Sequence, residues 1–191
     1  MLKGRIVRAV AGFYYVDVPG DGVYQCRAKG TFRREGSSPL VGDVVGINLT
    51  ETQDVEGNVE KIYPRTSMLT RPTVANVDQA LVIFALKEPD PNRLLLDRFL
   101  VSMETKKLPV VICFNKSDIT DEMRERELKG DYAACGYRVL ITSTKTGEGL
   151  DEVRAVLRGA LTTVAGPSGA GKSSLINCLQ KDVVMATGEV S

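Results

Sequence analysis

The chain contains no histidine, and its four cysteines lie far apart in the sequence, with no C-x-x-C pair among them. A zinc site is therefore not expected within this sequence, because structural zinc is held by cysteine and histidine at short spacings. Isolated thiols are typical of proteins that stay in the reducing cytoplasm. The chain also lacks the roughly 18 apolar residues of a membrane span, and its N-terminus shows no secretory signal. We expect a cytoplasmic protein without a membrane partner.

A strong net charge is also missing. The 25 lysine and arginine residues nearly balance the 24 aspartate and glutamate residues, which leaves a net charge of +1. No bulk electrostatic field therefore requires a nucleic-acid or membrane partner. The length of 191 residues suits one large domain or two small ones. The pattern of the sequence changes after residue 66, which favours two domains.

The first region, residues 1–66, is predicted to form a small all-β barrel. It consists of short alternating or β-branched segments, separated by turn signals such as Pro19-Gly20-Asp21-Gly22. About five such strands are typical of an SH3-like or an OB-fold barrel, and we favour the OB-fold. Residues 63–73, which include two prolines, are expected to be the inter-domain linker. The expected strands span residues 5–10, 13–18, 23–28, 43–49 and 57–63.

The second region, residues 67–191, is predicted to be an α/β domain. Its apolar runs show no polar alternation, which is typical of parallel strands that are buried on both faces. Strands alternating with helices indicate a doubly wound sheet, whose ligands bind at the carboxyl ends of the strands. The apolar runs span residues 80–86, 110–114, 139–142 and 161–165, and the expected helices span residues 92–107, 121–135, 150–161 and 171–180.

The string GPSGAGKSS matches the phosphate-binding loop pattern G-x-x-x-x-G-K-[ST] at each fixed position. Its glycines let the backbone direct N–H groups at phosphates, and the following helix adds its N-terminal partial charge. Lys172 and Ser173 are the expected catalytic residues, Lys172 at the β- and γ-phosphates and Ser173 as the Mg²⁺ ligand. The alternative is a glycine-rich turn between a strand and a helix. The predicted loop comprises Gly166, Pro167, Ser168, Gly169, Ala170, Gly171, Lys172, Ser173 and Ser174.

The string NKSD, residues 115–118, is similar to the N-K-x-D guanine-binding motif of GTPases. A carboxylate after a strand can accept hydrogen bonds from guanine N1–H and from its amino group, whereas adenine offers no such donor pair. Asp118 is the expected carboxylate. Asn115 is expected to bond the other edge of the purine and to brace the phosphate loop, and the stem of Lys116 is expected to cover a base face. In isolation, the motif would favour a helix N-cap. The predicted base-binding residues are Asn115, Lys116, Ser117 and Asp118.

Ser143, Thr144 and Lys145 follow the next apolar run and resemble the S-A-K loop, whose backbone N–H meets guanine O6 in GTPases. The alternative is an ordinary turn between a strand and a helix. Both guanine motifs precede the phosphate loop, which reverses the usual order in GTPases. This order indicates a circularly permuted GTPase domain, because a site depends on where loops lie in space and surface termini can be rejoined.

The barrel region contains one local excess of positive charge. Arg27, Lys29, Arg33 and Arg34 fall within eight residues, with Phe32 among them. OB-folds bind RNA through basic strand faces and loops, with aromatic side chains for stacking. We therefore expect an RNA-binding surface here. The alternative is a solvated charged loop.

With these motifs, the chain resembles the RsgA family of ribosome small subunit-dependent GTPases. The resemblance also includes the R-P-x-x-A-N-x-D junction at residues 71–78 and the string TGEVS at residues 187–191. It implies an OB-fold that contacts 16S ribosomal RNA, GTP and GDP as ligands together with Mg²⁺, and GTP hydrolysis stimulated by the small ribosomal subunit. It further implies a monomer that acts in the cytoplasm during late maturation of that subunit.

The family continues into a switch I threonine, a D-x-x-G loop and a zinc-binding C-terminal domain, and no D-x-x-G follows Ser173 in this sequence. We therefore expect an incomplete chain, with zinc only in the missing domain. For these residues alone we expect impaired nucleotide binding and very slow hydrolysis. Two other functions stay open. One is a non-catalytic RNA-binding assembly factor that uses GTP as a structural ligand. The other is a P-loop ATPase or small-molecule kinase in which NKSD is accidental.

Overall fold

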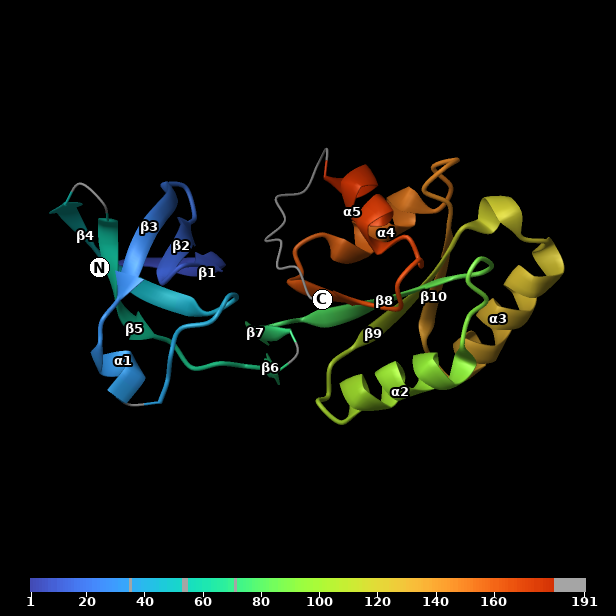
Figure 1. The fold of residues 1–191 in the computed structure, drawn as a ribbon, viewed down its shortest axis with the longest axis horizontal. Helices are drawn as coiled ribbons and strands as arrows, with labels where there is room; N and C mark the ends of the chain where they lie inside the picture. Colours follow the sequence, from blue (N-terminus) through green and yellow to red (C-terminus); the bar gives the residue numbers. More distant parts are fainter. Residues whose placement is uncertain (35, 53–54, 71, 181–191) are drawn as a thin grey trace. The chain divides into compact units, whose positions relative to one another are not determined.

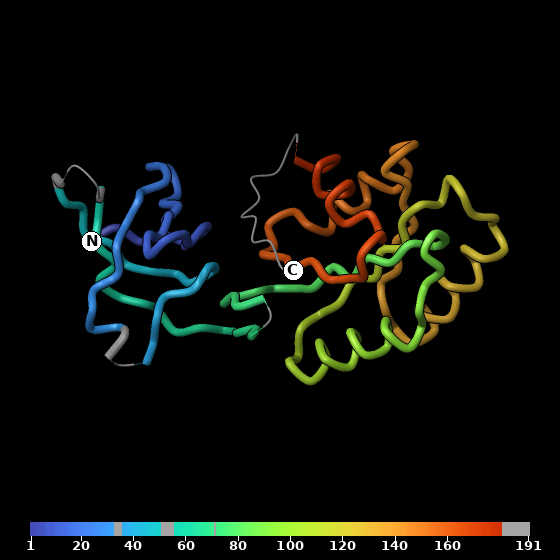
Figure 2. Tube along the Cα trace, viewed as in Figure 1, coloured from blue at the N-terminus to red at the C-terminus, as the bar shows by residue number. Residues whose placement is uncertain are grey.

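The computed structural model describes residues 1–34, 36–52, 55–70 and 72–180, which form two compact units (Figures 1 and 2). The first unit extends from Met1 to Val77, and the second begins at Asp78. Each unit encloses hydrophobic core residues of its own. The side chains of Arg33 and Arg34, all of Arg71 and the string at residues 187–191 lie outside this description.

The first unit is a closed five-stranded barrel in the order β1-β2-β3-β5-β4. Strands β3 and β5 pair in parallel and the other neighbours pair antiparallel, with the short helix α1 between β3 and β4. The two-residue connection of β1 to β2 has positive φ at Ala11 and Gly12, which suits a tight hairpin. The OB-type barrel predicted from the turn signals is confirmed. Its elements are β1 (Leu2–Val10), β2 (Phe13–Val18), β3 (Gly22–Ala28), α1 (Thr31–Arg34), β4 (Val44–Thr52) and β5 (Val55–Ile62).

The barrel core follows from the period-2 alternation of its strands. In β2, Val16 and Val18 are buried, while Asp17 between them is exposed. Phe32 of α1 is only 9% exposed and belongs to the same core. The expectation that Phe32 offers a stacking surface for RNA is therefore wrong, because the aromatic ring fills the barrel interior.

The described part of residues 63–73, predicted to be a linker, is more ordered than that prediction implied. They include β6 (Met68–Thr70), which pairs antiparallel with β7 (Thr73–Ala75). Arg65 forms a two-pronged ion pair with Asp43, with Nε–Oδ1 and Nη2–Oδ2 distances of 2.7 Å each. Asp43 is fully buried, so this ion pair attaches the segment firmly to the barrel.

The second unit contains a parallel sheet in the order β10-β9-β8-β11. The four apolar runs form parallel strands, as predicted. The central strands β8 and β9 are buried, whereas the edge strand β11 is largely half-buried. Asn92 and Asp121 cap α2 and α3 by accepting hydrogen bonds from Leu95 N and Arg124 N. The elements are β8 (Gln79–Ala85), α2 (Arg93–Glu104), β9 (Val110–Asn115), η1 (Ser117–Ile119), α3 (Glu122–Ala134), β10 (Arg138–Thr142), α4 (Leu150–Leu157), β11 (Thr162–Ala165) and α5 (Lys172–Leu179).

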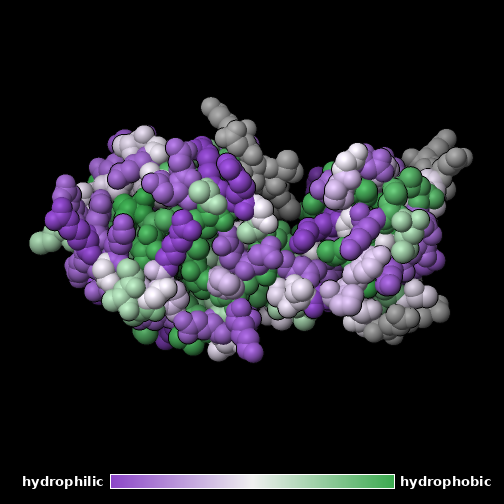
Figure 3. All heavy atoms as spheres, turned by 180° about the vertical axis from the view of Figure 1, so that it is seen from behind, coloured by the Kyte–Doolittle hydropathy of each residue, from purple (hydrophilic) through white to green (hydrophobic). Residues whose placement is uncertain are grey.

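Helices cover both faces of this sheet (Figure 1). Leu81 and Ile83 of β8 pack toward α4 and α5, whereas Val82 and Phe84 pack toward α2 and α3. Polar residues occupy much of the face seen in Figure 3, with apolar residues between them. Within the described residues, no helix is both long and apolar enough to span a membrane.

The first prediction concerns the ion pair between Arg65 and Asp43. Replacement Arg65→Ala leaves the Asp43 carboxylate buried without its cation, so we expect the free energy of unfolding to fall by about 3 kcal/mol. Urea denaturation followed by circular dichroism measures this loss. Lys29→Ala serves as the control in the same unit, because its ion pair with Glu60 is half exposed at Lys29 and contributes at most about 1 kcal/mol. Equal losses in the two variants would contradict the prediction.

Candidate functional site

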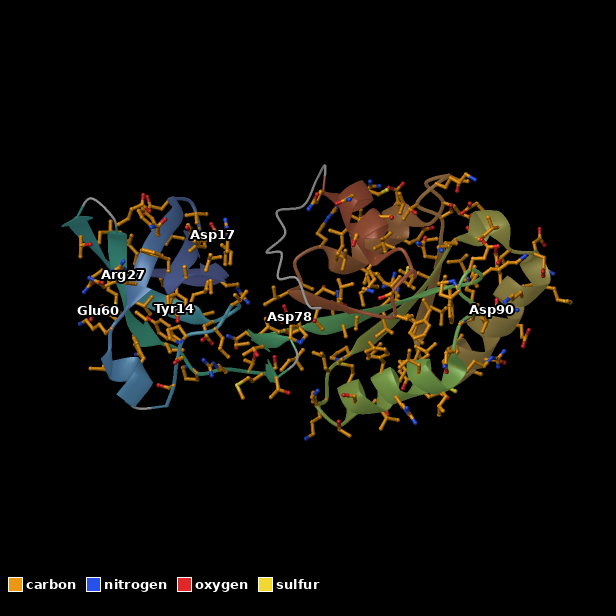
Figure 4. All side chains as sticks on the ribbon, in the orientation of Figure 1. Tyr14, Asp17, Arg27, Glu60, Asp78 and Asp90 are labelled. Carbon is orange, nitrogen blue, oxygen red and sulfur yellow. The ribbon has the colours of Figure 1, made fainter. Side chains whose placement is uncertain are left out.

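Three segments with predicted binding residues follow the carboxyl ends of parallel strands. The phosphate-loop segment (residues 166–171) follows β11, and the STK segment (residues 143–145) follows β10. The NKSD segment (residues 115–118) begins with the last residue of β9. In Figure 4, Asp78 marks the beginning of β8 and Asp90 lies beyond its carboxyl end. Because the strands are parallel, the three segments meet at the carboxyl edge of the sheet.

The phosphate-loop segment curves around the side chain of Lys172, the first residue of α5. Lys172 Nζ donates hydrogen bonds to the backbone carbonyls of Gly166 and Pro167, at 2.9 and 2.8 Å. Gly166 has φ 144°, and a Cβ added to it would lie 2.0 Å from the carbonyl oxygen of Ile83. Only glycine fits this close approach of the loop to β8.

Asn115, the last residue of β9, connects all three segments. It is fully buried, and its Nδ2 donates to the carbonyl of Ala170 in the phosphate-loop segment at 3.1 Å. Its Oδ1 accepts from Thr142 Oγ1 at 3.2 Å and from the backbone N of Thr144 at 3.4 Å. A Cβ added to Gly171 would lie 2.2 Å from Asn115 Nδ2, which explains the glycine there. The expected brace between Asn115 and the phosphate loop is therefore present.

Asp118 presents an ionised carboxylate beside the STK segment. Its Oδ1 accepts from Ser143 Oγ at 2.6 Å, and Lys145 Nζ lies 3.7 Å from its Oδ2. The hydrogen bond from Ser143 lowers the pKa of Asp118, and the charge of Lys145 adds to this effect. The residue as a whole is exposed, although its side chain is only 13% exposed.

Some of the other predicted residues have contacts within the protein, and others are exposed. Lys116 adopts a left-handed conformation with φ 69°, and its Nζ donates to the carbonyl of Glu88. Ser117 is buried, and its Oγ donates to Glu148 Oε2 at 2.7 Å, so its hydroxyl has a partner inside the protein. Ala170 is fully buried against the core. The exposed group consists of Ser168, Gly169, Ser173 and Ser174.

Sequence reasoning missed two residues that hold these segments. Thr142 ends β10 and binds Asn115, and Glu148 binds Ser117 from the turn before α4. Thr142 directly precedes the STK segment, and Glu148 lies within the string TSTKTGEGL. Their closeness in sequence to the STK segment is the signal that could have identified them. In the described ranges, no group of three or more His, Cys, Asp or Glu side chains could hold a metal ion.

Two family models match this chain. The model described as RsgA GTPase matches residues 62–191, and the model described as RsgA N-terminal domain matches residues 3–57. The two matches correspond in position to the α/β unit and the barrel. The first alone includes more than half of the chain.

Curated relatives match along the full chain. The small ribosomal subunit biogenesis GTPase RsgA of Agathobacter rectalis is 54% identical over 200 residues, which cover 100% of this chain and 66% of the relative. The protein of the same name from Alkaliphilus metalliredigens is 46% identical over 191 residues, which cover 100% of this chain and 65% of the relative. The chain thus spans 66% and 65% of the length of these relatives.

Solved structures share the fold. YjeQ from Thermotoga maritima superposes with a TM-score of 0.85 at 34% identity, over 95% of this chain and 66% of that chain. YloQ, described as a circularly permuted GTPase, superposes with a TM-score of 0.79 at 40% identity, over 93% of this chain and 63% of that chain. The permuted loop order inferred from the sequence matches the description of this second structure.

The second prediction concerns the hydrogen bond from Thr142 to Asn115. Replacement Thr142→Val keeps the shape of the side chain but removes the donor, which leaves buried Asn115 Oδ1 with one partner fewer. We expect the free energy of unfolding to fall by about 1 to 2 kcal/mol in urea denaturation. Thr142→Ser keeps the hydroxyl and is expected to lose less. The prediction fails if the valine variant is at least as stable as the serine variant.

Proposed function

The chain belongs to the RsgA GTPase family, and from this premise we propose that it binds GTP and hydrolyses it to GDP and phosphate. The observation that supports this most directly is the buried Asn115 amide, which joins the two guanine-type segments to the phosphate-loop segment. A single ligand can then touch all three segments. The chain would act in the cytoplasm as a monomer.

Guanine recognition is assigned to Asp118. Its carboxylate has acceptor capacity beyond the bond from Ser143, and it would accept from N1–H and the exocyclic amine of guanine. Adenine lacks this pair of donors and would leave the carboxylate desolvated without partners. A backbone N–H of the STK segment would exchange its present acceptor within the protein for guanine O6. The stem of Lys116 would cover one face of the base.

Phosphate binding is assigned to Lys172 and the backbone of the phosphate-loop segment. The ammonium of Lys172 would exchange its two carbonyl acceptors for phosphate oxygens, since charge-assisted hydrogen bonds are stronger than those to neutral groups. The N-terminus of α5 adds partial positive charge at the same place. Ser174, in the first turn of α5, would donate to the α-phosphate.

Mg²⁺ fits the residues that are present. Ser173 is exposed in the first turn of α5, next to Lys172. Mg²⁺ in nucleotide sites needs few protein ligands, because it keeps several waters and binds phosphate oxygens. The Ser173 hydroxyl would supply one protein ligand, and phosphate oxygens and waters would supply others. When bound, Mg²⁺ neutralises charge on the β- and γ-phosphates.

The barrel is the proposed contact for the small ribosomal subunit and its 16S ribosomal RNA. On its outer surface, Arg27 Cζ lies 4.6 Å from the ring centre of Phe13, and Arg8 Cζ lies 5.2 Å from that of Tyr15. Both rings belong to β2, and the arginines come from the neighbouring strands (Figure 4 labels Arg27). Arginines that bind phosphates beside rings that stack on bases are typical of single-stranded RNA binding.

A second candidate function is a non-catalytic RNA-binding assembly factor with GTP as a structural ligand. The cation–aromatic face of Arg8, Phe13, Tyr15 and Arg27 favours this function. Its residues are far in sequence from the phosphate-loop segment. Phosphate release from GTP, measured with and without purified small ribosomal subunits, separates the two functions. Release that the subunits accelerate supports the enzyme, and no release in either condition supports the structural role.

Substitution of Asp118 tests the guanine site. Asp118→Asn replaces an acceptor with an amide that also donates toward the guanine donors, so we expect GDP affinity to fall by roughly 100-fold or more. Displacement of a fluorescent GDP measures this, and ATP should displace it poorly from the unaltered chain. Asp121→Asn is the matched control, because asparagine also caps α3 and the same charge is lost. Unchanged GDP affinity in Asp118→Asn would refute the assignment.

Substitution of Arg27 tests the RNA face. Arg27→Ala should weaken binding to purified small ribosomal subunits and reduce the slope of log affinity against log salt by about 1. Arg126→Ala is the control, because Arg126 is an exposed arginine that is already paired with Glu122. A salt slope that both substitutions leave unchanged would argue against the face.

A further inference from the structure

Glu148 lies outside the three predicted motifs, yet it contacts two of the three segments. It precedes Gly149 in the turn between β10 and α4. Its carboxylate Oε2 accepts a hydrogen bond from Ser117 Oγ at 2.7 Å. Its backbone carbonyl accepts from the backbone N of Ser143 at 3.0 Å. One residue therefore joins the NKSD segment to the STK segment.

These contacts close a ring around Asp118. Ser117 is its neighbour in the chain, and Ser143 Oγ donates to Asp118 Oδ1 at 2.6 Å. Glu148 completes the ring, because it binds Ser117 on one side and Ser143 on the other. Neither segment can shift relative to the other without breaking one of these hydrogen bonds. The Asp118 carboxylate is thereby fixed relative to the N–H groups of the STK segment.

The burial of Ser117, Ser143 and Glu148 shows how the orientation of the Ser117 side chain is determined. Ser117 is 7% exposed and Ser143 is fully buried, whereas Glu148 is exposed. A buried hydroxyl that loses its acceptor costs free energy, and a hydroxyl bound to a carboxylate is held more tightly than one bound to a neutral group. The side chain of Ser117 therefore takes its orientation from Glu148.

We propose that Glu148 is a positioning residue for guanine recognition. This inference rests on the proposed binding of GTP. The Glu148 side chain acts through Ser117 rather than by touching the base, while its backbone carbonyl, which any residue would supply, holds Ser143. The side chain thereby holds Asp118 where the carboxylate meets N1–H and the exocyclic amine together. Its loss therefore weakens discrimination at the amine. Hypoxanthine, which lacks that amine but keeps N1–H, is the base that reports this loss.

Displacement of fluorescent GDP by unlabelled GDP and IDP tests the proposal on the full chain. The unaltered chain is expected to prefer GDP to IDP. Glu148→Ala should weaken GDP binding about tenfold and bring the ratio of the IDP and GDP dissociation constants toward 1. Glu148→Gln keeps an acceptor and should restore most of the preference. Glu152→Ala, at another exposed glutamate in the first turn of α4, is the matched control and should change neither quantity.

A double-mutant cycle separates positioning from general destabilisation. Ser117→Ala should reproduce the effect of Glu148→Ala, and the double variant should bind GDP no more weakly than either single variant. The ratio of two dissociation constants does not depend on the fraction of folded protein, so a folding defect alone leaves it unchanged. An unchanged ratio in Glu148→Ala, or losses that add in the double variant, would overturn the proposal. An unaltered chain that binds neither nucleotide would instead refute the proposed function, and this inference with it.

Discussion

One buried amide determines whether three separate segments form a single site. Asn115 Nδ2 donates to the carbonyl of Ala170, while its Oδ1 accepts from Thr142 and Thr144. The amide has one orientation that satisfies all of these groups, because a carbonyl only accepts and a backbone N–H only donates. Aspartate, although similar in shape, would place an oxygen against the Ala170 carbonyl. The position therefore requires a side chain that donates on one side and accepts on the other.

The same contact explains why the order of the motifs along the chain is of little consequence. Asn115 pairs with Thr142 in the register of β9 and β10, so these two residues end neighbouring strands at the same edge. Strand β8 separates β9 from β11, and the phosphate-loop segment crosses its end closely enough that Gly166 nearly touches the Ile83 carbonyl. Asn115 and Ala170 are 55 residues apart in sequence, yet they meet because the sheet fixes where the loops emerge. Rejoining the termini elsewhere leaves these strand neighbours unchanged.

Local patterns were sufficient for the barrel strands, the parallel strands and the family, all of which are confirmed. They failed where the deciding contact joins distant residues. Arg65 looked like part of a linker because its partner, Asp43, lies 22 residues earlier. Phe32 looked available among basic residues because composition does not reveal which side of a short helix faces the core. Motif matching identifies residues that touch a ligand, but it misses those that hold such residues, as Glu148 holds Ser117 from another loop.

The two ends of the site differ in charge, and so do the two ends of a guanine nucleotide, which has a neutral base and anionic phosphates. At the base end, Asp118 stays ionised because the hydrogen bond from Ser143 lowers its pKa. Burial raises the pKa of Glu125, and the charge of Glu148 adds to this effect. At the other end, Lys172 and the N-terminus of α5 supply positive charge. A base edge rich in N–H donors suits the first end and anionic phosphates suit the second, so a reversed nucleotide would place its phosphates beside the Asp118 carboxylate. The neutral Asn115 amide joins the segments that form these two ends, while the charges at the two ends favour one direction for the proposed ligand.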